Sequence, residues 1–253
     1  DLRICRLAIR SPAISPKAPM TTLPARTHDH PARVGPDGKL PLWALRGHAA
    51  HFKSKHEEFD ACKLGMWLFL TTEILLFAGI FVAYGVYRML YPEAFVAGSG
   101  FLNPTIGLAN TIVLLVSSWL VVMAVRNAQL DQQKWLRINL ALAILCGIAF
   151  LAIKFSLEYY PKWSEGKRPG VFFDYPFAVS PYEPIWWGIY YAGTAIHAFH
   201  VIIGGALLGW CLVRSFKQAY GPTEYTMVEM SGLYWHLVDV IWIFLFPLLY
   251  LIH

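Results

Sequence analysis

The sequence predicts an all-α integral membrane protein with five transmembrane helices. Two features of its composition and one of its pattern support this prediction. Of the 253 residues, 57% are hydrophobic and only 15% are charged, whereas soluble globular proteins carry about 25% charged residues. The hydrophobic residues also gather into five long runs, and a helix needs roughly 20 apolar residues to cross the hydrocarbon core of a bilayer.

The first two runs have simple boundaries. The first is interrupted only by Glu73. The second begins after Asn103 with Pro104, which is tolerated there because the first turn of a helix has no intrahelical partner for its N–H groups. It ends at Arg126.

The remaining three runs are bounded by charges and helix breakers. The third carries Lys154 and Glu158 in its last turn, the fourth begins directly after Pro184, and the fifth follows the break at Gly221 and Pro222. The predicted spans are residues about 64–88, 104–125, 136–158, 185–213 and 228–252.

Lys and Arg side chains near the span ends predict the orientation, because cytoplasmic loops carry an excess of them. They gather before the first span, after the second and after the fourth: Arg46, Lys53, Lys55, Lys63, Arg126, Lys134, Arg137, Arg214 and Lys217. The loop between the third and fourth spans offsets its basic residues with acids. We therefore expect the N-terminus inside and the C-terminus outside.

The N-terminal part of the chain has a different character. Residues 1–45 are rich in Pro, Arg and His without an apolar period, so we expect a flexible extension that buries no core. Residues 1–19 lack an apolar signal-peptide core, and we favour an upstream extension, with Met20 as the natural start, over a transit-like segment. We expect residues 46–63 to lie at the inner surface before a transmembrane domain over residues 64–253.

Charge and cysteine content exclude two classes of function. The formal charge is +5, but the basic residues fall in the tail and the loops and form no single stripe, so we expect no nucleic-acid partner. The four cysteines (Cys5, Cys62, Cys146 and Cys211) are too widely spaced for a metal clamp or a covalently attached haem.

Three ionisable residues in the first and third spans need an explanation, because such a side chain at mid-bilayer costs about 2.5–3.5 kcal/mol on insertion scales. Glu73 lies nine residues past Leu64, roughly 14 Å deep at about 1.5 Å per residue. It is either a proton-active carboxyl or a neutral acid that links two helices by a hydrogen bond. Lys154 and Glu158 are four residues apart and are expected to pair near the outer interface.

The fourth and fifth spans each carry polar groups on one face. His197 and His200 share a face of the fourth, and Glu229, His236 and Asp239 share a face of the fifth. Histidines and acids in a bundle can bind a metal ion, but no Glu-x-x-His motif occurs on any span. We favour a buried hydrogen-bond network that joins the third, fourth and fifth spans and is centred on Glu158, His197, His200, His236 and Asp239, with no metal bound.

Five sequence blocks accompany the spans. They are Lys63-Leu-Gly-Met-Trp-Leu-Phe-Leu-Thr-Thr-Glu73, Leu102-Asn103-Pro104 with Asn110-Thr111, Glu158-Tyr159-Tyr160, His197-Ala-Phe-His200-Val-Ile-Ile-Gly204, and Tyr234-Trp-His236-Leu-Val-Asp239-Val-Ile-Trp242. Any one block alone is weakly specific. In this order, from about Phe52 to the C-terminus, they resemble the cytochrome c oxidase subunit III family.

The resemblance implies a supporting subunit of a proton-translocating oxidase in aerobic respiration. Such a subunit binds no haem or copper itself and packs against subunit I, which contains the haem–copper centre. It stabilises subunit I, sustains proton uptake at the inner surface and protects the enzyme from inactivation during turnover. Subunit II is a second expected partner, and a respiratory supercomplex is a further candidate.

The resemblance also assigns site residues. A structural phospholipid is expected in a cleft, with Phe69, Glu73 and Arg214 at the matching positions. Separately from the resemblance, the polar residues of the spans lead us to expect a buried polar network: Lys154, Glu158, His197, His200, Glu229, His236 and Asp239. No catalytic residue is expected in this chain.

The number of spans departs from mitochondrial members, which have seven helices. Five spans resemble the bacterial forms, so we expect the bacterial inner (plasma) membrane in preference to the mitochondrial inner membrane. The departure leaves two alternatives within the same family, the third subunit of a quinol oxidase and a nitric oxide reductase accessory protein. An alternative of another class is a free-standing intramembrane metalloenzyme that uses His197, His200 and His236.

Overall fold

The structure is a computed structural model that describes residues 40–252. The predictions for residues 1–39, including the natural start at Met20, lie outside the described residues. Within residues 40–252 the secondary structure is helical, apart from an isolated bridge between Gly221 and Glu224.

Eight α-helices, one π-helix and one 3₁₀-helix make up the described part of the chain. They are α1 (Leu42–Leu45), α2 (Lys55–Leu90), α3 (Pro92–Gly100), α4 (Pro104–Gln129), α5 (Gln133–Ile153), the π-helix (Lys154–Tyr159), α6 (Tyr160–Ser164), the 3₁₀-helix (Gly170–Phe172), α7 (Glu183–Ser215) and α8 (Thr226–Tyr250). Five helical segments are long and apolar enough to cross a bilayer: α2, α4, the continuous stretch Gln133–Ser164, α7 and α8. The predicted set of five spans is therefore confirmed.

The first spanning helix is longer than the predicted apolar run. It begins at Lys55, where Ser54 caps it: the Ser54 hydroxyl oxygen accepts a hydrogen bond from the backbone N–H of Glu57 at 3.2 Å. The Glu57 carboxylate in turn accepts one from the backbone N–H of Lys53 at 2.8 Å. Such caps satisfy N–H groups that would otherwise lack a partner. The predicted surface segment 46–63 is therefore helical from Lys55 onward, which is half of its length.

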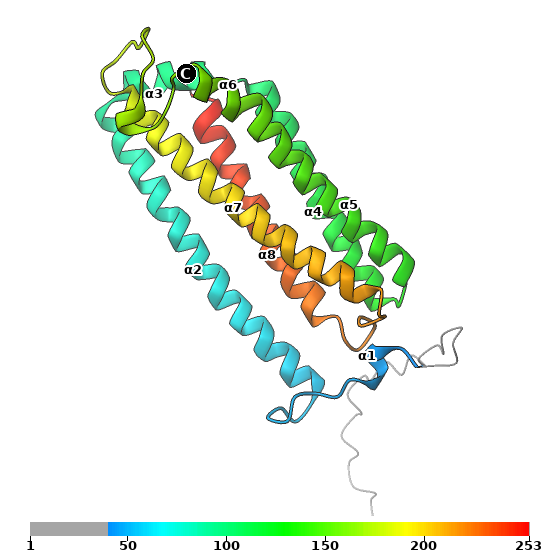
Figure 1. Cartoon of the computed structure of the whole chain (residues 1–253). Helices are drawn as coiled ribbons and strands as arrows, with labels where there is room; N and C mark the ends of the chain where they lie inside the picture. The colour runs from blue at the N-terminus through cyan, green and yellow to red at the C-terminus, as the bar shows by residue number, and fades with distance from the viewer. Residues whose placement is uncertain (1–39, 253) are drawn as a thin grey trace, which may run out of the picture. The chain divides into compact units, whose positions relative to one another are not determined.

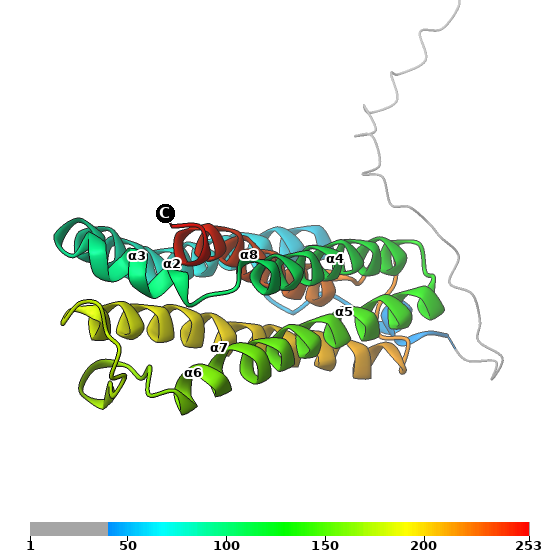
Figure 2. The same ribbon diagram turned by 90° about the horizontal axis from the view of Figure 1, so that it is seen from above.

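Four of the spanning helices form a closed group, and α2 lies against its side (Figure 1). Within the group α4 packs on α5 and α8, and α7 packs on the same two helices, while α2 contacts α7 and α8. Seen along the other direction, α2, α8 and α4 form one layer and α7 and α5 the other (Figure 2). The end of this bundle that carries α1 is called the α1 end below, and the opposite end, which carries α3 and α6, is called the α3 end.

The packing of α8 against α5 and α7 depends on two glycines. A Cβ atom at Gly147 on α5 or at Gly204 on α7 would lie 2.8 Å from the indole ring of Trp235. Trp235 is almost fully buried, and its ring N–H donates a hydrogen bond to the Ser117 hydroxyl on α4 at 3.0 Å. One side chain of α8 thus reaches α4, α5 and α7, because glycine leaves room for the indole ring on two of these helices.

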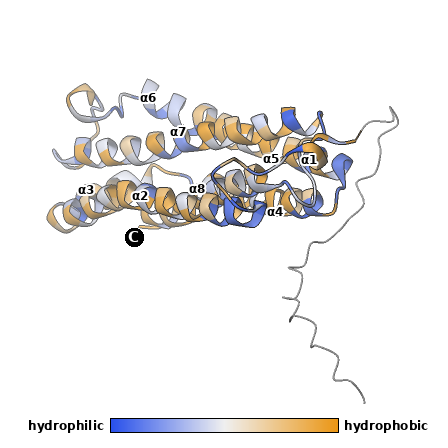
Figure 3. Ribbon diagram, turned by 90° about the horizontal axis from the view of Figure 1, so that it is seen from below, coloured by the Kyte–Doolittle hydropathy of each residue, from blue (hydrophilic) through white to orange (hydrophobic). Residues whose placement is uncertain are grey.

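The lipid-facing surface is apolar, and α2 is the least enclosed of the spanning helices. Hydrophobic residues cover the lengths of the helices, and many hydrophilic ones lie toward the α1 end (Figure 3). Only 11% of the apolar window of α2 is buried within the chain, against 50% for α8. Because apolar contact between helices in a bilayer gains little over contact with lipid tails, the few polar contacts of α2 matter for its attachment.

The segment before α2 is attached to the loop between α7 and α8. Trp43 of α1 is buried against Gly221, where a Cβ atom would lie 2.5 Å from the indole ring. The Trp43 backbone N–H donates to the Gln218 carbonyl at 3.3 Å, and Arg46 pairs with Glu224 at 3.2 Å. These contacts order the α1 end of the bundle.

Candidate functional site

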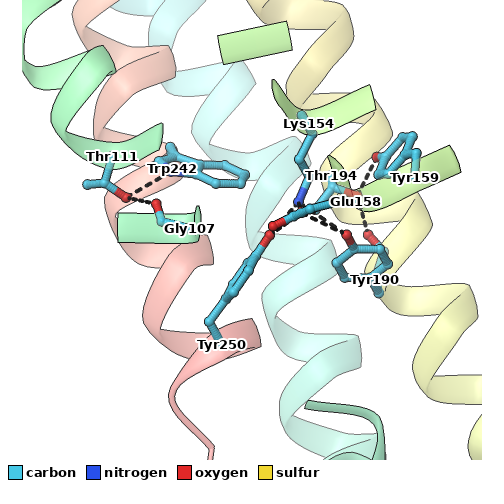
Figure 4. A network of polar contacts seen from close by, with 9 residues as sticks. All are labelled: Gly107, Thr111, Lys154, Glu158, Tyr159, Tyr190, Thr194, Trp242 and Tyr250. Atoms are coloured by element: carbon cyan, nitrogen blue, oxygen red, sulfur yellow. Dashed lines mark hydrogen bonds and ion pairs between the residues drawn. The ribbon is translucent and has the colours of Figure 1, made fainter. Parts of the chain in front are cut away.

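The most enclosed polar cluster lies at the α3 end, where α5 passes into the π-helix. Lys154 and Glu158 are both 1% exposed and form an ion pair. The Lys154 ammonium also donates to the Tyr250 hydroxyl at 2.6 Å and to the Tyr190 hydroxyl at 3.2 Å. Both tyrosine hydroxyls donate to Glu158, as Figure 4 shows. The cluster therefore joins the π-helix to α7 and α8.

Aromatic rings surround the Lys154 ammonium. It lies 4.9 Å from the ring centre of Tyr190, 5.1 Å from those of Trp242 and Tyr250, and 5.7 Å from that of Tyr159. Ring faces attract a cation, more strongly where water is excluded. Together with the carboxylate they explain how a lysine is accommodated inside an apolar bundle.

A second polar contact joins the middle of α2 to the middle of α7. The Glu73 carboxyl lies 2.9 Å from the Nε2 atom of His200. The Nδ1 atom of His200 lies 2.8 Å from the Ile196 carbonyl, and because a carbonyl only accepts, Nδ1 must carry a proton. The Glu73 carboxyl and the Nε2 atom of His200 then share one proton. The proton lies on the acid when the imidazole is neutral, and on Nε2 when the two groups form an ion pair. In both cases the pair is neutral as a whole, which suits its depth in a bilayer.

Two further contacts attach α2 near the same face. The Phe69 ring, which is partly exposed, stacks on Tyr234 of α8 with ring centres 6.0 Å apart. Closer to the α1 end, the Lys63 ammonium lies 3.1 Å from the Glu229 carboxylate. Phe69 therefore lies at the surface of the bundle, and Glu229 is an ion-pair partner of α2.

Three polar residues near the middle of α7 and α8 have fewer hydrogen-bond partners than the Lys154 cluster. The Nδ1 atom of His236 lies 2.6 Å from the Ser118 hydroxyl of α4. The Asp239 carboxyl is 3% exposed, and neither oxygen has a hydrogen-bond partner among the described residues. His197 on α7 is fully buried, stacks on Trp242 with ring centres 5.0 Å apart, and also has both ring nitrogens unpaired within residues 40–252.

Arg214 ends α7 at the α1 end of the bundle. Its guanidinium takes part in none of the ion pairs found among the described residues. It lies close to Tyr220 in the following loop, where burial raises the pKa of the tyrosine hydroxyl well above its usual value while the charge of Arg214 acts in the opposite direction. Among residues 40–252, therefore, no acid neutralises this guanidinium.

The structure divides the predicted network into separate contacts. It brings together Lys154 with Glu158, and it pairs His200 with Glu73 on another helix. His236 has its own partner on α4, and no group of three or more His, Cys, Asp or Glu side chains with metal-binding geometry occurs within residues 40–252. Tyr190, Tyr250 and Ser118 could not be recognised from the sequence as members of these contacts, because hydroxyl groups carry no charge that marks them within an apolar run.

The fold and these contacts define a class of protein: a multi-pass helical membrane protein whose intramembrane ionisable groups mostly pair with neighbouring helices. Comparison with known proteins makes the assignment specific. The sequence profile of the family "Cytochrome c oxidase subunit III" matches residues 46–253, and the chain belongs to this family.

Curated relatives agree with the family assignment. The chain is 31% identical over 195 residues to "Cytochrome c oxidase subunit 3" of Cyprinus carpio, in an alignment that covers 74% of this chain and 68% of the relative. The protein of the same name in Oryctolagus cuniculus is 32% identical over the same shares. "Heme-copper oxidase subunit I+III" of Aeropyrum pernix is 30% identical over 199 residues, which cover 76% of this chain and 23% of the relative.

These findings confirm the resemblance and the functional class. The chain is a subunit III of a haem–copper oxidase, and thus part of an oxidoreductase complex in a membrane. The alternatives of a quinol oxidase subunit, a nitric oxide reductase accessory protein and a free-standing metalloenzyme are not favoured by these relatives.

Proposed function

We propose that this chain is a non-redox subunit that stabilises subunit I of a cytochrome c oxidase, supports its proton uptake and holds structural phospholipid. The observation that carries the proposal is the family match over residues 46–253. The contacts of the ionisable groups support it, since Lys154, Glu158, Glu73 and His200 link helices of this chain. In this proposal the haem and copper lie in partner subunits.

Subunit I is the first partner that we propose. The Aeropyrum pernix relative carries subunits I and III in its name as one protein, which supports direct contact between the two. Subunit II and a respiratory supercomplex are further proposed partners. We also propose the bacterial plasma membrane, with the α1 end inside, because the basic residues of the described chain that flank the spans favour that orientation.

Purification of a tagged chain from its native membrane tests the partnership. We expect a haem–copper subunit I to accompany it in stoichiometric amount and the complex to reduce oxygen with cytochrome c as donor. Removing the chain is expected to leave subunit I less stable without removing its haem. A chain that is recovered without any haem–copper partner, in detergents that preserve oxidases, would contradict the proposal.

Phospholipid is proposed to bind with its phosphate at Arg214 and an acyl chain toward Phe69. The free guanidinium at the end of α7 can hold a phosphate in two places. Phe69 lies one turn from Glu73 and hence near the level of His200, its partner on α7. At about 1.5 Å per residue, Arg214 is roughly 20 Å from His200 along α7, a separation that an acyl chain can bridge.

Replacing Arg214 with Ala is expected to reduce the amount of anionic phospholipid that copurifies with the complex. The physical reason is the loss of two charge-assisted hydrogen bonds to phosphate, each stronger than a neutral one. Mass spectrometry of lipids in the purified complex measures the effect. Arg168→Ala, which removes the same charge at the α3 end, is the matched control and should leave the anionic lipid content unchanged. Equal lipid content in the Arg214 variant and the wild type would exclude Arg214 as the phosphate site.

A further inference from the structure

A groove between α4 and α8 leads from the α1 end toward the middle of the bundle. It has a volume of about 310 Å³ and is lined by Arg126 and Glu229 near the α1 end, and by Val122, Gly232 and His236 further in. This volume is far above the roughly 30 Å³ that one water molecule occupies in the liquid. With four polar side chains in its wall, counting Gln129, the groove can hold water.

The groove ends one helical turn from an unpartnered acid. Asp239 follows His236 by three residues on α8, so the two share a face. The Asp239 carboxyl is 3% exposed, and both of its oxygens lack a hydrogen-bond partner among the described residues. Because an ionised carboxylate without a partner is costly at this depth, the acid form suits the site.

A hydroxyl group lies between the imidazole and the acid. The Ser118 oxygen lies 2.6 Å from the Nδ1 atom of His236. It also lies beside the Asp239 carboxyl, without completing a hydrogen bond to it. A hydroxyl can accept one proton and donate another, so Ser118 is placed to pass a proton between its two neighbours.

We propose that Asp239 is an exchangeable proton-binding site, reached by water in the α4–α8 groove through His236 and Ser118. A proton from groove water binds the Nε2 atom of His236, and the ring's Nδ1–H proton moves to Ser118. The Ser118 hydroxyl proton moves to the ionised Asp239 carboxylate, so one proton enters from the groove and one is bound by the acid. The imidazole is then neutral with its single N–H proton on Nε2. Release of that proton to groove water and uptake of a proton at Nδ1 return the imidazole to its first tautomer.

Other charged groups face this site from the neighbouring helices. Glu229 and Arg126 stand at the groove, and Lys63 of α2 pairs with Glu229. Glu73 and His200 form the pair between α2 and α7, and His197 lies on α7. Within residues 40–252 none of these residues forms a hydrogen bond to Asp239, so the proposed route is the one through Ser118.

Infrared spectroscopy of the purified oxidase complex tests the proposal. With aspartate labelled by ¹³C in its side chain, we expect a carboxylic-acid C=O band that is absent in Asp239→Asn and shifts on transfer to D₂O. Val122→Phe fills the groove, and His236→Phe removes the imidazole. Each should slow the shift by about tenfold or more, because exchange then requires transient opening of packed helices.

Val116→Phe is the matched control, since Val116 is an exposed residue of α4 outside the groove, and its exchange should equal that of the wild type. Absence of an aspartic-acid band from the wild type would overturn the proposal, as would a band that persists in Asp239→Asn. Equal exchange rates in the wild type and in His236→Phe, or in Val116→Phe and Val122→Phe, would exclude this route.

Discussion

Replacing Lys154 with Met is expected to destabilise the folded bundle by about 3–5 kcal/mol, because the change leaves a buried charge without its partner. The lysine and Glu158 are each 1% exposed. After the substitution the carboxylate would keep only the hydroxyl groups of Tyr190 and Tyr250. Thermal unfolding of the complex, together with the fraction of this subunit retained after a detergent wash, measures the loss.

The double variant Lys154→Met with Glu158→Leu separates charge from packing. Replacing a whole buried ion pair with apolar side chains is often neutral or stabilising, so the double variant should recover much of the stability that the single variant loses. Lys53→Met, at an exposed position outside the spanning helices, is the control and should change little. A double variant less stable than Lys154→Met alone would show that the pair contributes more than mutual neutralisation.

The spans could be predicted because their signal is local. A run of apolar residues is visible without knowledge of its neighbours, and the chain has five such runs. The start of α2 could not be read from hydropathy, because the cap by Ser54 and the acidic first turn precede the apolar run. The π-helix at 154–159 has no local signal of this kind, since it depends on the inward placement of Lys154 and Glu158 among other helices.

The partners of the ionisable residues depend on which helices are neighbours. Lys154 and Tyr250 are 96 residues apart in the sequence, and Glu73 and His200 are 127 apart. The sequence predicted one network centred on Glu158, His197, His200, His236 and Asp239. Their side chains instead meet different helices, because α8 lies between α4 and α2 in one layer and packs on α7 in the other (Figure 2).

Glu73→Gln and Glu73→Leu are expected to differ, although both remove the charge. His200 donates through Nδ1 to the Ile196 carbonyl, so its neutral form presents an acceptor at Nε2. The amide N–H of Gln can donate to that acceptor, and the variant should assemble and retain most of its turnover. Leu cannot donate, and the unpaired nitrogen of an imidazole only 8% exposed costs about 1–3 kcal/mol.

Glu73→Leu is also expected to loosen the attachment of α2, because this helix makes few contacts with the rest of the described chain. Besides Glu73, its polar attachments within residues 40–252 include the ion pairs of Lys63 with Glu229 and of Lys55 with Glu224, and the Tyr84 hydroxyl, which donates to the Leu248 carbonyl at 2.5 Å. Thermal unfolding of the complex should rank wild type and Gln above Leu. Combining Glu73→Leu with His200→Phe removes the orphaned acceptor, so the double variant should be more stable than the sum of the two single losses predicts. Strictly additive losses of stability would mean that the Glu73 and His200 side chains are not energetically coupled. Loss of oxygen reduction in a fully assembled Glu73→Gln variant would instead place Glu73 in the proton chemistry of the enzyme.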